Sequence, residues 1–485
     1  MNTTTTNNKE GTVEAEKAQL PPFDPNTIIL EKKMRSLTEY LRVRNGALAS
    51  MGYFYEMAEG LYSTRKEELS AFKGKGGKVV GIMCNFVPEE LILAAGAVPV
   101  RLAFGYSDTI LAAEEYLPRN FCPLLKSSFG TFLKNNPLFT LCDVVIIPTS
   151  CDGKKKMGEL ISPFKQVWVL EVPHCTNTTQ GRDLWLREVK LLSKRLTKLT
   201  GRWITRPRLS KAITVVNRKR AMVRRLYETR KKDPSIWGRD ALLVTSISYF
   251  DDVQRWTLKT EELCAEVESR QPLVSADVPR IMITGSPLVA PTWKVPIIIE
   301  ESGGIVVTDD LCTGTKGYWD PVERNFFASD QFISIADRYL MNTCACFTPN
   351  TPREVRLKHF VEDWRIDGVV YHVSQACHTY GMEQRRINQE MERLSVPVLN
   401  IETDFSQEDV EQIRTRIEAF LELIVAKKRR SRQSDGKDAR SLPGGGIKGF
   451  LPAGGFPIHE QPAGKRFEGR DGQKLDSKKL EPPGG

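Results

Sequence analysis

The chain has 485 residues, of which 40% are apolar and 27% are charged, and these proportions are typical of globular proteins. Because this length exceeds what one ordinary hydrophobic core organises, we expect two or more domains. No apolar run approaches the roughly 18 residues of a membrane span, and the first ten residues lack the apolar core of a secretion signal. We therefore expect a cytoplasmic protein, whose ten cysteines are metal ligands or free thiols rather than a disulfide framework.

The positive charge is concentrated at one end of the sequence. The whole chain has 70 Lys and Arg against 60 Asp and Glu, a net charge of +10. Residues 427–485 alone contain 14 Lys and Arg against 7 Asp and Glu, and 18 of these 59 residues are Gly or Pro. This composition predicts a disordered basic tail and no specific nucleic-acid partner. Weak association of the tail with anionic surfaces is the alternative interpretation.

The first part of the chain changes from a helical pattern to an alternating one. Residues 1–72 combine a loose N-terminus with a helical segment from about Thr27 to Phe72. Short apolar runs then alternate with helix-length segments over residues 73–178, which predicts a first α/β domain. Its predicted strands are residues 79–83, 97–101, 143–147 and 167–170.

The alternating pattern returns after a mostly helical connector at residues 179–277. Residues 278–426 predict a second α/β domain that a helix at 407–426 completes. Continuous apolar strands separated by helices indicate parallel sheets covered on both faces, so we expect two doubly wound domains. The predicted strands of the second domain are residues 280–284, 304–308, 368–373 and 396–401.

Cysteines follow several of the predicted strands. Ligands of an open parallel sheet bind outside the carboxyl ends of the strands. Cys84, Cys151, Cys312 and Cys377 each follow a predicted strand. Cys122 precedes a predicted helix, whose N-terminus would stabilise a thiolate. We therefore expect these sulfur atoms to meet in one crevice between the domains.

The other five cysteines divide into two groups. Cys344 and Cys346 form a Cys-Ala-Cys sequence in a predicted loop between two helices, and we group them with the ligand candidates. Cys142 lies just before a buried strand and Cys264 lies within an amphipathic helix, so we interpret both as core residues. The pattern around Cys175 is ambiguous, and we interpret it as structural.

The spacing of the cysteines favours an iron–sulfur site over a zinc site. Structural zinc sites use paired Cys-x₂₋₄-Cys segments, and the sequence has none. Single cysteines dispersed over two domains fit an iron–sulfur group held between them. Inert core cysteines, and a catalytic pair of Cys377 and His378, remain as alternatives. The sequence also lacks the phosphate-binding Gly-x₄-Gly-Lys-Ser/Thr motif, so we expect no ATP hydrolysis by this chain.

A set of separate motifs spans about Lys73 to Ala426. These motifs are Cys84-Asn-Phe-Val-Pro-Glu-Glu-Leu-Ile-Leu-Ala-Ala-Gly-Ala-Val-Pro-Val-Arg101, Cys122-Pro-Leu-Leu-Lys-Ser-Ser128, Thr149-Ser-Cys-Asp-Gly-Lys-Lys-Lys-Met157, Gly285-Ser-Pro, Glu300-Glu-Ser-Gly-Gly-Ile-Val-Val-Thr-Asp-Asp-Leu-Cys312, Asp367-Gly-Val-Val370 and Gln375-Ala-Cys-His378. In this order they resemble the 2-hydroxyacyl-CoA dehydratase D-component family, which includes benzoyl-CoA reductase subunits. The resemblance implies paired flavodoxin-like domains with an iron–sulfur cluster in the cleft between them.

The resemblance also implies which cysteines bind the cluster. The usual single 4Fe-4S cluster would take Cys122, Cys151 and Cys377. The additional cysteines are similar to those of the single-subunit branch, in which an 8Fe-9S double cubane uses six cysteines; here they are Cys84, Cys312, Cys344 and Cys346. Cys346 with Thr348-Pro-Asn350 resembles a motif of that branch. The metal ligands we expect are therefore Cys84, Cys122, Cys151, Cys346 and Cys377.

The resemblance implies low-potential reduction of a small molecule, with electrons from a separate ATP-hydrolysing iron–sulfur activator and with homodimerisation of the chain. The first alternative is an (R)-2-hydroxyacyl-CoA dehydratase component with a single 4Fe-4S cluster and an acyl-CoA substrate. The second is a non-catalytic metal-binding protein. Glu89, Glu90 and His378 are the catalytic candidates; for the two glutamates the alternative is that they favour the dipole at a helix start. Lys154, Lys155 and Lys156 would hold an anionic cluster or contact a partner's acidic surface, or they would simply face solvent.

Overall fold

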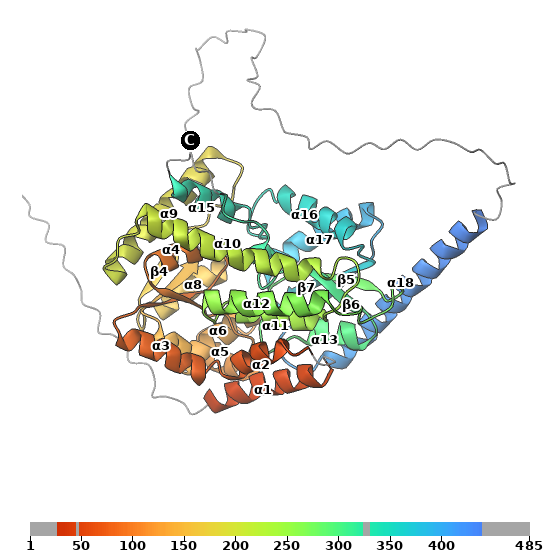
Figure 1. Cartoon of the computed structure of the whole chain (residues 1–485), viewed down its shortest axis with the longest axis horizontal. Coiled ribbons are helices and arrows are strands. Elements are labelled where there is room, and N and C mark those ends of the chain that lie inside the picture. Colours follow the sequence, from red (N-terminus) through yellow and green to blue (C-terminus); the bar gives the residue numbers. More distant parts are fainter. Residues whose placement is uncertain (1–26, 45–47, 324–329, 439–485) are drawn as a thin grey trace, which may run out of the picture. The chain divides into compact units, whose positions relative to one another are not determined.

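The computed structural model describes residues 27–44, 48–323 and 330–438, and those up to Ser431 pack as one unit with two parallel sheets (Figure 1). Each sheet has four strands, in the orders β2-β1-β3-β4 and β6-β5-β7-β8. This is the start of a flavodoxin-like strand order in both cases. The predicted fold class of two doubly wound α/β domains is confirmed. No helix within the described ranges combines the length and the apolar character that crossing a bilayer requires.

Three helices precede the first sheet, where the sequence predicted one helical segment. They are α1 (Thr27–Arg44), α2 (Met51–Glu59) and α3 (Thr64–Gly74). Met34 and Leu41 on α1 and Phe54 on α2 are buried, so the apolar side chains at helical spacing form part of the core. The predicted loose N-terminus up to residue 26 lies outside the described residues.

The first sheet is built from strands whose side chains are almost all apolar. β1 and β3 occupy its centre and are buried along their whole length, which explains their continuous apolar sequence. The strands are β1 (Val79–Ile82), β2 (Val98–Arg101), β3 (Val144–Pro148) and β4 (Val167–Leu170). The helices between them are α4 (Glu89–Ala94), α5 (Ile110–Glu114), α6 (Pro123–Leu133), α7 (Pro137–Leu141) and α8 (Asp152–Ile161), with a 3₁₀ turn at Ser107–Thr109.

The segment predicted as a helical connector contains four helices. They are α9 (Thr179–Thr200), α10 (Arg206–Glu228), α11 (Gly238–Ile247) and α12 (Val253–Glu268). Gly201 ends α9 in the left-handed conformation, which a residue without a Cβ adopts at little cost.

The second sheet repeats the order of the first. Its central strands β5 and β7 are also buried throughout. The strands are β5 (Arg280–Gly285), β6 (Ile305–Asp310), β7 (Gly368–Ser374) and β8 (Val398–Thr403). The helices are α13 (Lys294–Glu301), α14 (Thr315–Tyr318), α15 (Gln331–Leu340), α16 (Thr351–Asp363), α17 (His378–Arg393) and α18 (Val410–Asp438).

The last helix, α18, extends into the segment that the sequence assigned to the tail. It was predicted to end at Ala426 and continues to Asp438. Lys and Arg are good helix formers, and two of the basic side chains make contacts: Lys427 donates to the Ser395 carbonyl at 2.6 Å, and Lys428 lies 2.7 Å from Asp367. The rest of the predicted tail lies outside the described residues.

Helix α10 joins the two halves of the molecule (Figure 1). Its Lys219 and Arg220 form buried ion pairs with Glu89 and Glu90 at the start of α4, at 2.9 and 2.6 Å. Two turns further along, the Tyr227 hydroxyl donates to Asp309 in β6. One rigid element therefore contacts both domains close to their strand ends.

Candidate metal centre

A cavity of about 260 Å³ lies where strands of both sheets end. Residues that follow β1, β3, β6 and β7 form its wall, so both domains contribute to it. Six cysteines line the cavity: Cys84, Cys122, Cys151, Cys312, Cys344 and Cys377. The structure thus brings together sulfur-bearing residues that are dispersed over most of the ordered sequence.

Three of these cysteines directly precede helices. Cys122, Cys151 and Cys377 occupy the position before α6, α8 and α17. The free N–H groups of a first helical turn favour negative charge at such positions. A hydrogen bond between the thiols of Cys122 and Cys377 raises the pKa of Cys122 and lowers the pKa of Cys377 to about 6. Burial raises the pKa of Cys151.

Two further cysteines follow strands without heading a helix. Cys84 and Cys312 are 3% and 5% exposed, so their sulfur atoms are almost completely shielded from water. Burial raises the pKa of Cys312 to about 11. Burial also opposes ionisation of Cys84, but the positive charges of Lys154 and Arg101 outweigh it and lower the pKa of this thiol.

The Cys-Ala-Cys segment contributes one residue to the cavity wall. Cys344 lines the cavity, whereas Cys346 is not part of its wall and donates a thiol hydrogen bond to Cys344. This hydrogen bond lowers the pKa of Cys344 to about 5 and raises the pKa of Cys346. The geometry therefore favours Cys344 as the residue that faces a ligand, whereas the sequence had favoured Cys346.

A hydrogen-bond network joins the cysteine loops of the two domains. The Asn85 side chain donates to the carbonyl of Cys312, and the same carbonyl accepts from Tyr249 at 2.8 Å. Arg101 donates to the Asn85 side-chain oxygen and stacks over the Tyr249 ring at 4.9 Å. Residues 85 and 312 are 227 positions apart, which is why the sequence alone did not single out Asn85.

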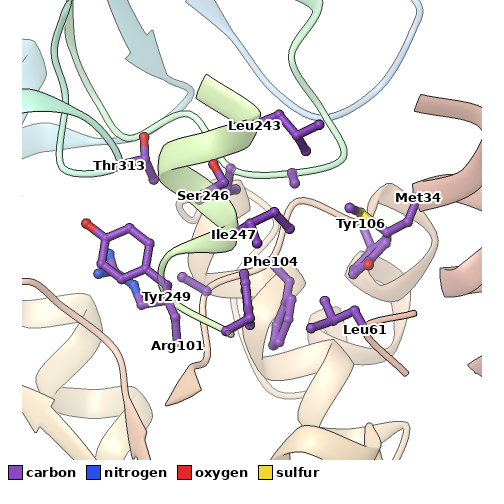
Figure 2. Close-up of a pocket in the computed structure, with 14 residues that line it drawn as sticks. Met34, Leu61, Arg101, Phe104, Tyr106, Leu243, Ser246, Ile247, Tyr249 and Thr313 are labelled. Carbon is purple, nitrogen blue, oxygen red and sulfur yellow. The ribbon is translucent and has the colours of Figure 1, made fainter. Parts of the chain in front are cut away.

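A small apolar pocket of about 30 Å³ lies beside this network (Figure 2). Figure 2 shows Arg101 and Tyr249 on one side of it, and Phe104 and Leu61 on another. Arg101 and Asn85 are only 5% and 8% exposed, so bulk water is kept away from their contact. A low local dielectric strengthens such hydrogen bonds.

A second network ties the remaining cysteine segments together. Arg353 on α16 is fully buried and donates to Asp310, two residues before Cys312, at 2.9 Å. It also pairs with Glu383 on α17, the helix that Cys377 heads. Asn350 donates to both Glu383 and the carbonyl of Cys344. The sequence showed acidic residues at the end of an apolar strand, but nothing in it indicated that Arg353 would be their partner.

The predicted catalytic candidates lie in different places. Glu89 and Glu90 are buried in their ion pairs with α10 and do not line the cavity, which favours their structural interpretation. His378 lines the cavity and its side chain is exposed at the rim. Lys154 also lines the cavity, whereas the side chains of Lys155 and Lys156 are 54% and 69% exposed.

The remaining cysteines lie outside the cavity wall. Cys142 and Cys264 are buried, and the Cys142 thiol donates to the Leu138 carbonyl at 3.0 Å, so their interpretation as core residues is confirmed. Cys175 is exposed.

The donor set suits a group with several metal atoms. Among the described residues, no three His, Cys, Asp or Glu side chains converge as they would around a single metal ion. The six cysteines instead line a cavity of about 260 Å³. Cysteine thiolates are the ligands that iron–sulfur clusters take. An iron–sulfur cluster therefore fits these residues better than zinc.

The profile of the 2-hydroxyglutaryl-CoA dehydratase D-component family matches residues 84–424. The chain belongs to this family. It is 37% identical to YjiM of Escherichia coli (strain K12), which carries a provisional name as a dehydratase subunit, over 73% of this chain and 93% of YjiM.

Other members of the dehydratase D-component family match over a similar length. The (R)-phenyllactyl-CoA dehydratase beta subunit of Clostridium sporogenes is 24% identical over 77% of this chain and 98% of its own. A benzoyl-CoA reductase subunit of Thauera aromatica is 23% identical over 72% of this chain and 91% of its own. The chain is accordingly an enzyme component of the dehydratase or reductase type.

Proposed function

We propose that this chain holds an iron–sulfur cluster in its cysteine cavity and uses it for low-potential reduction of a small molecule. The observation that carries the proposal is the convergence of six cysteines from two domains on one buried space. The names of family members, which include dehydratase and reductase subunits, support it. A separate ATP-hydrolysing iron–sulfur activator would supply the electrons, since the sequence contains no phosphate-binding motif of its own.

The six cysteines suggest a double cubane rather than a single cluster. In this assignment Cys122, Cys151 and Cys377 bind one 4Fe unit. The second unit takes the other three lining residues, which are Cys84, Cys312 and Cys344. Cys346 then acts through its hydrogen bond to Cys344 rather than as a ligand.

The surrounding residues hold the sulfur atoms and limit access to them. When bound, an iron–sulfur cluster supplies one-electron transfer at low potential. The chain keeps water from the cavity with Phe121, Leu124 and Leu125, which form part of its wall. His378 is the imidazole that lines the cavity within the described ranges, and we assign substrate binding or proton supply at the rim to it.

The alternative is an (R)-2-hydroxyacyl-CoA dehydratase component with a single 4Fe-4S cluster. Its support is the match to the (R)-phenyllactyl-CoA dehydratase beta subunit over nearly the whole of that protein. This alternative requires a second, different subunit and an acyl-CoA substrate, whereas the first proposal expects a homodimer. Size-exclusion chromatography with light scattering, together with thioester-dependent turnover, distinguishes the two.

Iron and sulfide counting on anaerobically purified protein tests the proposal. About eight irons per chain are expected for a double cubane, and about four for the single cluster. Cys84→Ala is expected to lower the count toward about four, because Cys84 belongs only to the larger ligand set. Cys175→Ala, which changes an exposed cysteine away from the cavity, serves as the matched control and should keep the full count.

Two outcomes of this experiment would contradict the proposal. Protein that contains no iron or sulfide, and shows no visible charge-transfer absorbance, would contradict both cluster proposals and favour a non-catalytic metal-binding role. Equal loss of iron in the Cys84 and Cys175 variants would show that the cavity geometry does not determine the ligands.

A further inference from the structure

Two buried hydroxyl groups contact cysteine sulfur atoms, one in each domain. The Ser150 hydroxyl lies 3.7 Å from the sulfur of Cys84. The Tyr380 hydroxyl lies 3.8 Å from the sulfur of Cys312. Both residues line the cavity, and both are 5% exposed. The contacts therefore lie inside the site rather than at its solvent-facing rim.

Each hydroxyl is in turn held by a lysine. Lys154 donates to the Ser150 hydroxyl at 3.0 Å, and Lys316 donates to the Tyr380 hydroxyl at 3.2 Å. An ammonium group has donors only, so the hydroxyl oxygen must accept from it. The proton of the hydroxyl is then free to point at the sulfur atom. The order lysine, hydroxyl, sulfur is the same in both domains, and we call these two chains of contacts the Ser150 arm and the Tyr380 arm.

Both lysines are positioned so that their charge acts on the cavity. Lys316 is fully buried, and its ammonium group also lies 3.3 Å from Asp310 and 5.2 Å from the centre of the Tyr380 ring. Lys154 lines the cavity, and within the described ranges no carboxylate lies at ion-pair distance from it. Charges in such a poorly hydrated space are only weakly screened.

The two arms contact Cys84 and Cys312, and neither of these cysteines directly precedes a helix. Cys122, Cys151 and Cys377 head helices, where backbone N–H groups provide the favourable electrostatics. At Cys84 and Cys312 the arms supply side-chain hydroxyl donors instead of the N–H groups of a helix start. Side-chain substitution can therefore change the electrostatics at these two sulfur atoms while the helix-heading cysteines keep their own.

We propose that the Ser150 arm and the Tyr380 arm stabilise added negative charge at Cys84 and Cys312, and so raise the reduction potential of the group that these cysteines help to hold. The inference rests on the proposed iron–sulfur function. Hydrogen bonds to ligand sulfur and nearby positive charge both stabilise the reduced state of a cluster. One electron enters from an external one-electron donor, which is oxidised; no bond breaks, and the hydroxyl protons stay on Ser150 and Tyr380.

Redox titration of the anaerobic holoprotein tests the arms. Tyr380→Phe and Ser150→Ala each remove one hydroxyl and little volume, and each is expected to shift the midpoint potential to a more negative value. Combining them should shift it further than either change alone. Lys156→Met is the matched control, because it removes a lysine of the same helix as Lys154 whose side chain is 69% exposed; its potential should equal that of the wild type.

Iron and sulfide content, measured on the same samples, separates the possible failures. A full iron content with a wild-type potential in both hydroxyl variants would overturn the inference and leave the iron–sulfur function standing. Loss of iron in these variants would also overturn it, because the arms would then serve to retain the cluster. Absence of iron from the wild type would overturn the proposed function and this inference together. Lys316→Met is expected to shift the midpoint potential to a more negative value at full iron content, which would support a contribution of the Lys316 charge to the Tyr380 arm.

Discussion

The two α/β domains share a strand order but place their cysteines differently. In each domain the third strand along the chain leads to a cysteine that heads the next helix: Cys151 after β3 and Cys377 after β7. The first strands differ, since Cys84 follows β1 whereas Ser286 follows the equivalent strand β5. Cys312 lies two residues after β6, whereas the first cysteine after β2 is Cys122, just before α6. The repeated topology thus accounts for one pair of cysteines, and the others depend on features specific to each domain.

The supports of the cysteine loops differ in the same way. In the first domain, α4 is anchored to α10 by two ion pairs that lie outside the cavity wall. In the second domain, Arg353 contacts Asp310 and Glu383, and Asn350 joins Glu383 to the Cys344 carbonyl, so three cysteine-bearing segments are connected. We therefore expect the second domain to be more sensitive to the loss of a single charge.

Replacing Arg353 by Met is expected to have the largest effect on stability. The change removes the buried guanidinium that Asp310 and Glu383 share and leaves Asp310 with Lys316 as its cation, which costs about 3–5 kcal/mol in the free energy of unfolding. Denaturant unfolding followed by circular dichroism measures it. Lys358→Met, at a side chain that is 51% exposed, is the control and should change stability by no more than about 0.5 kcal/mol. A loss below about 1 kcal/mol for Arg353→Met would show that the network does not support the second domain.

The second domain should also make the protein sensitive to acid. His372 in β7 is 4% exposed, and its burial lowers its pKa to about 4, whereas β3 of the first domain contains no histidine. Below a pH of about 6.5 the unfolded chain binds a proton that the folded chain does not, so stability falls as the pH decreases toward about 4. Between pH 7 and pH 5 this histidine should cost the wild type about 2 kcal/mol.

Comparison with His372→Gln isolates this effect. The variant lacks the titrating group, so its stability should fall by about 2 kcal/mol less than that of the wild type over the same pH interval. Denaturant unfolding at both pH values gives the difference. Parallel curves for the two proteins would mean that His372 does not titrate in this range.

The smallest expected effect concerns the extension of α18. Lys428 and Asp367 form a partly exposed ion pair at 2.7 Å, which should contribute no more than about 1 kcal/mol. Lys428→Met is expected to lower stability by that amount, less at high salt because the pair is screened. Unfolding at low and high salt measures both. A salt-independent loss would assign the contribution to packing of the lysine stem instead.

The sequence predicted the fold well because its strands are continuous apolar runs with recognisable helices between them. Every predicted strand is present, and the boundaries differ by a few residues at most. The end of α18 was missed because a basic, polar segment gives no apolar periodicity, although its first side chains have partners.

The cysteines were found because their position after strands is visible in the sequence. Their supports were not, because Asn85, Tyr249 and Arg353 act across distances of up to 227 positions along the chain. The pairing of Lys316 with Tyr380 was hidden for the same reason, being separated by 64 positions. Which of Cys344 and Cys346 lines the cavity depends on the conformation of their loop, which the spacing of the cysteines does not determine.

The most direct test of the central claim is a crystal structure of anaerobically prepared protein with anomalous diffraction at the iron edge. We predict iron peaks inside the cavity, between the sulfur atoms of Cys151 and Cys377 and extending toward those of Cys84 and Cys312. Iron bound elsewhere, or a cavity filled only by water in protein that still contains iron, would contradict the account.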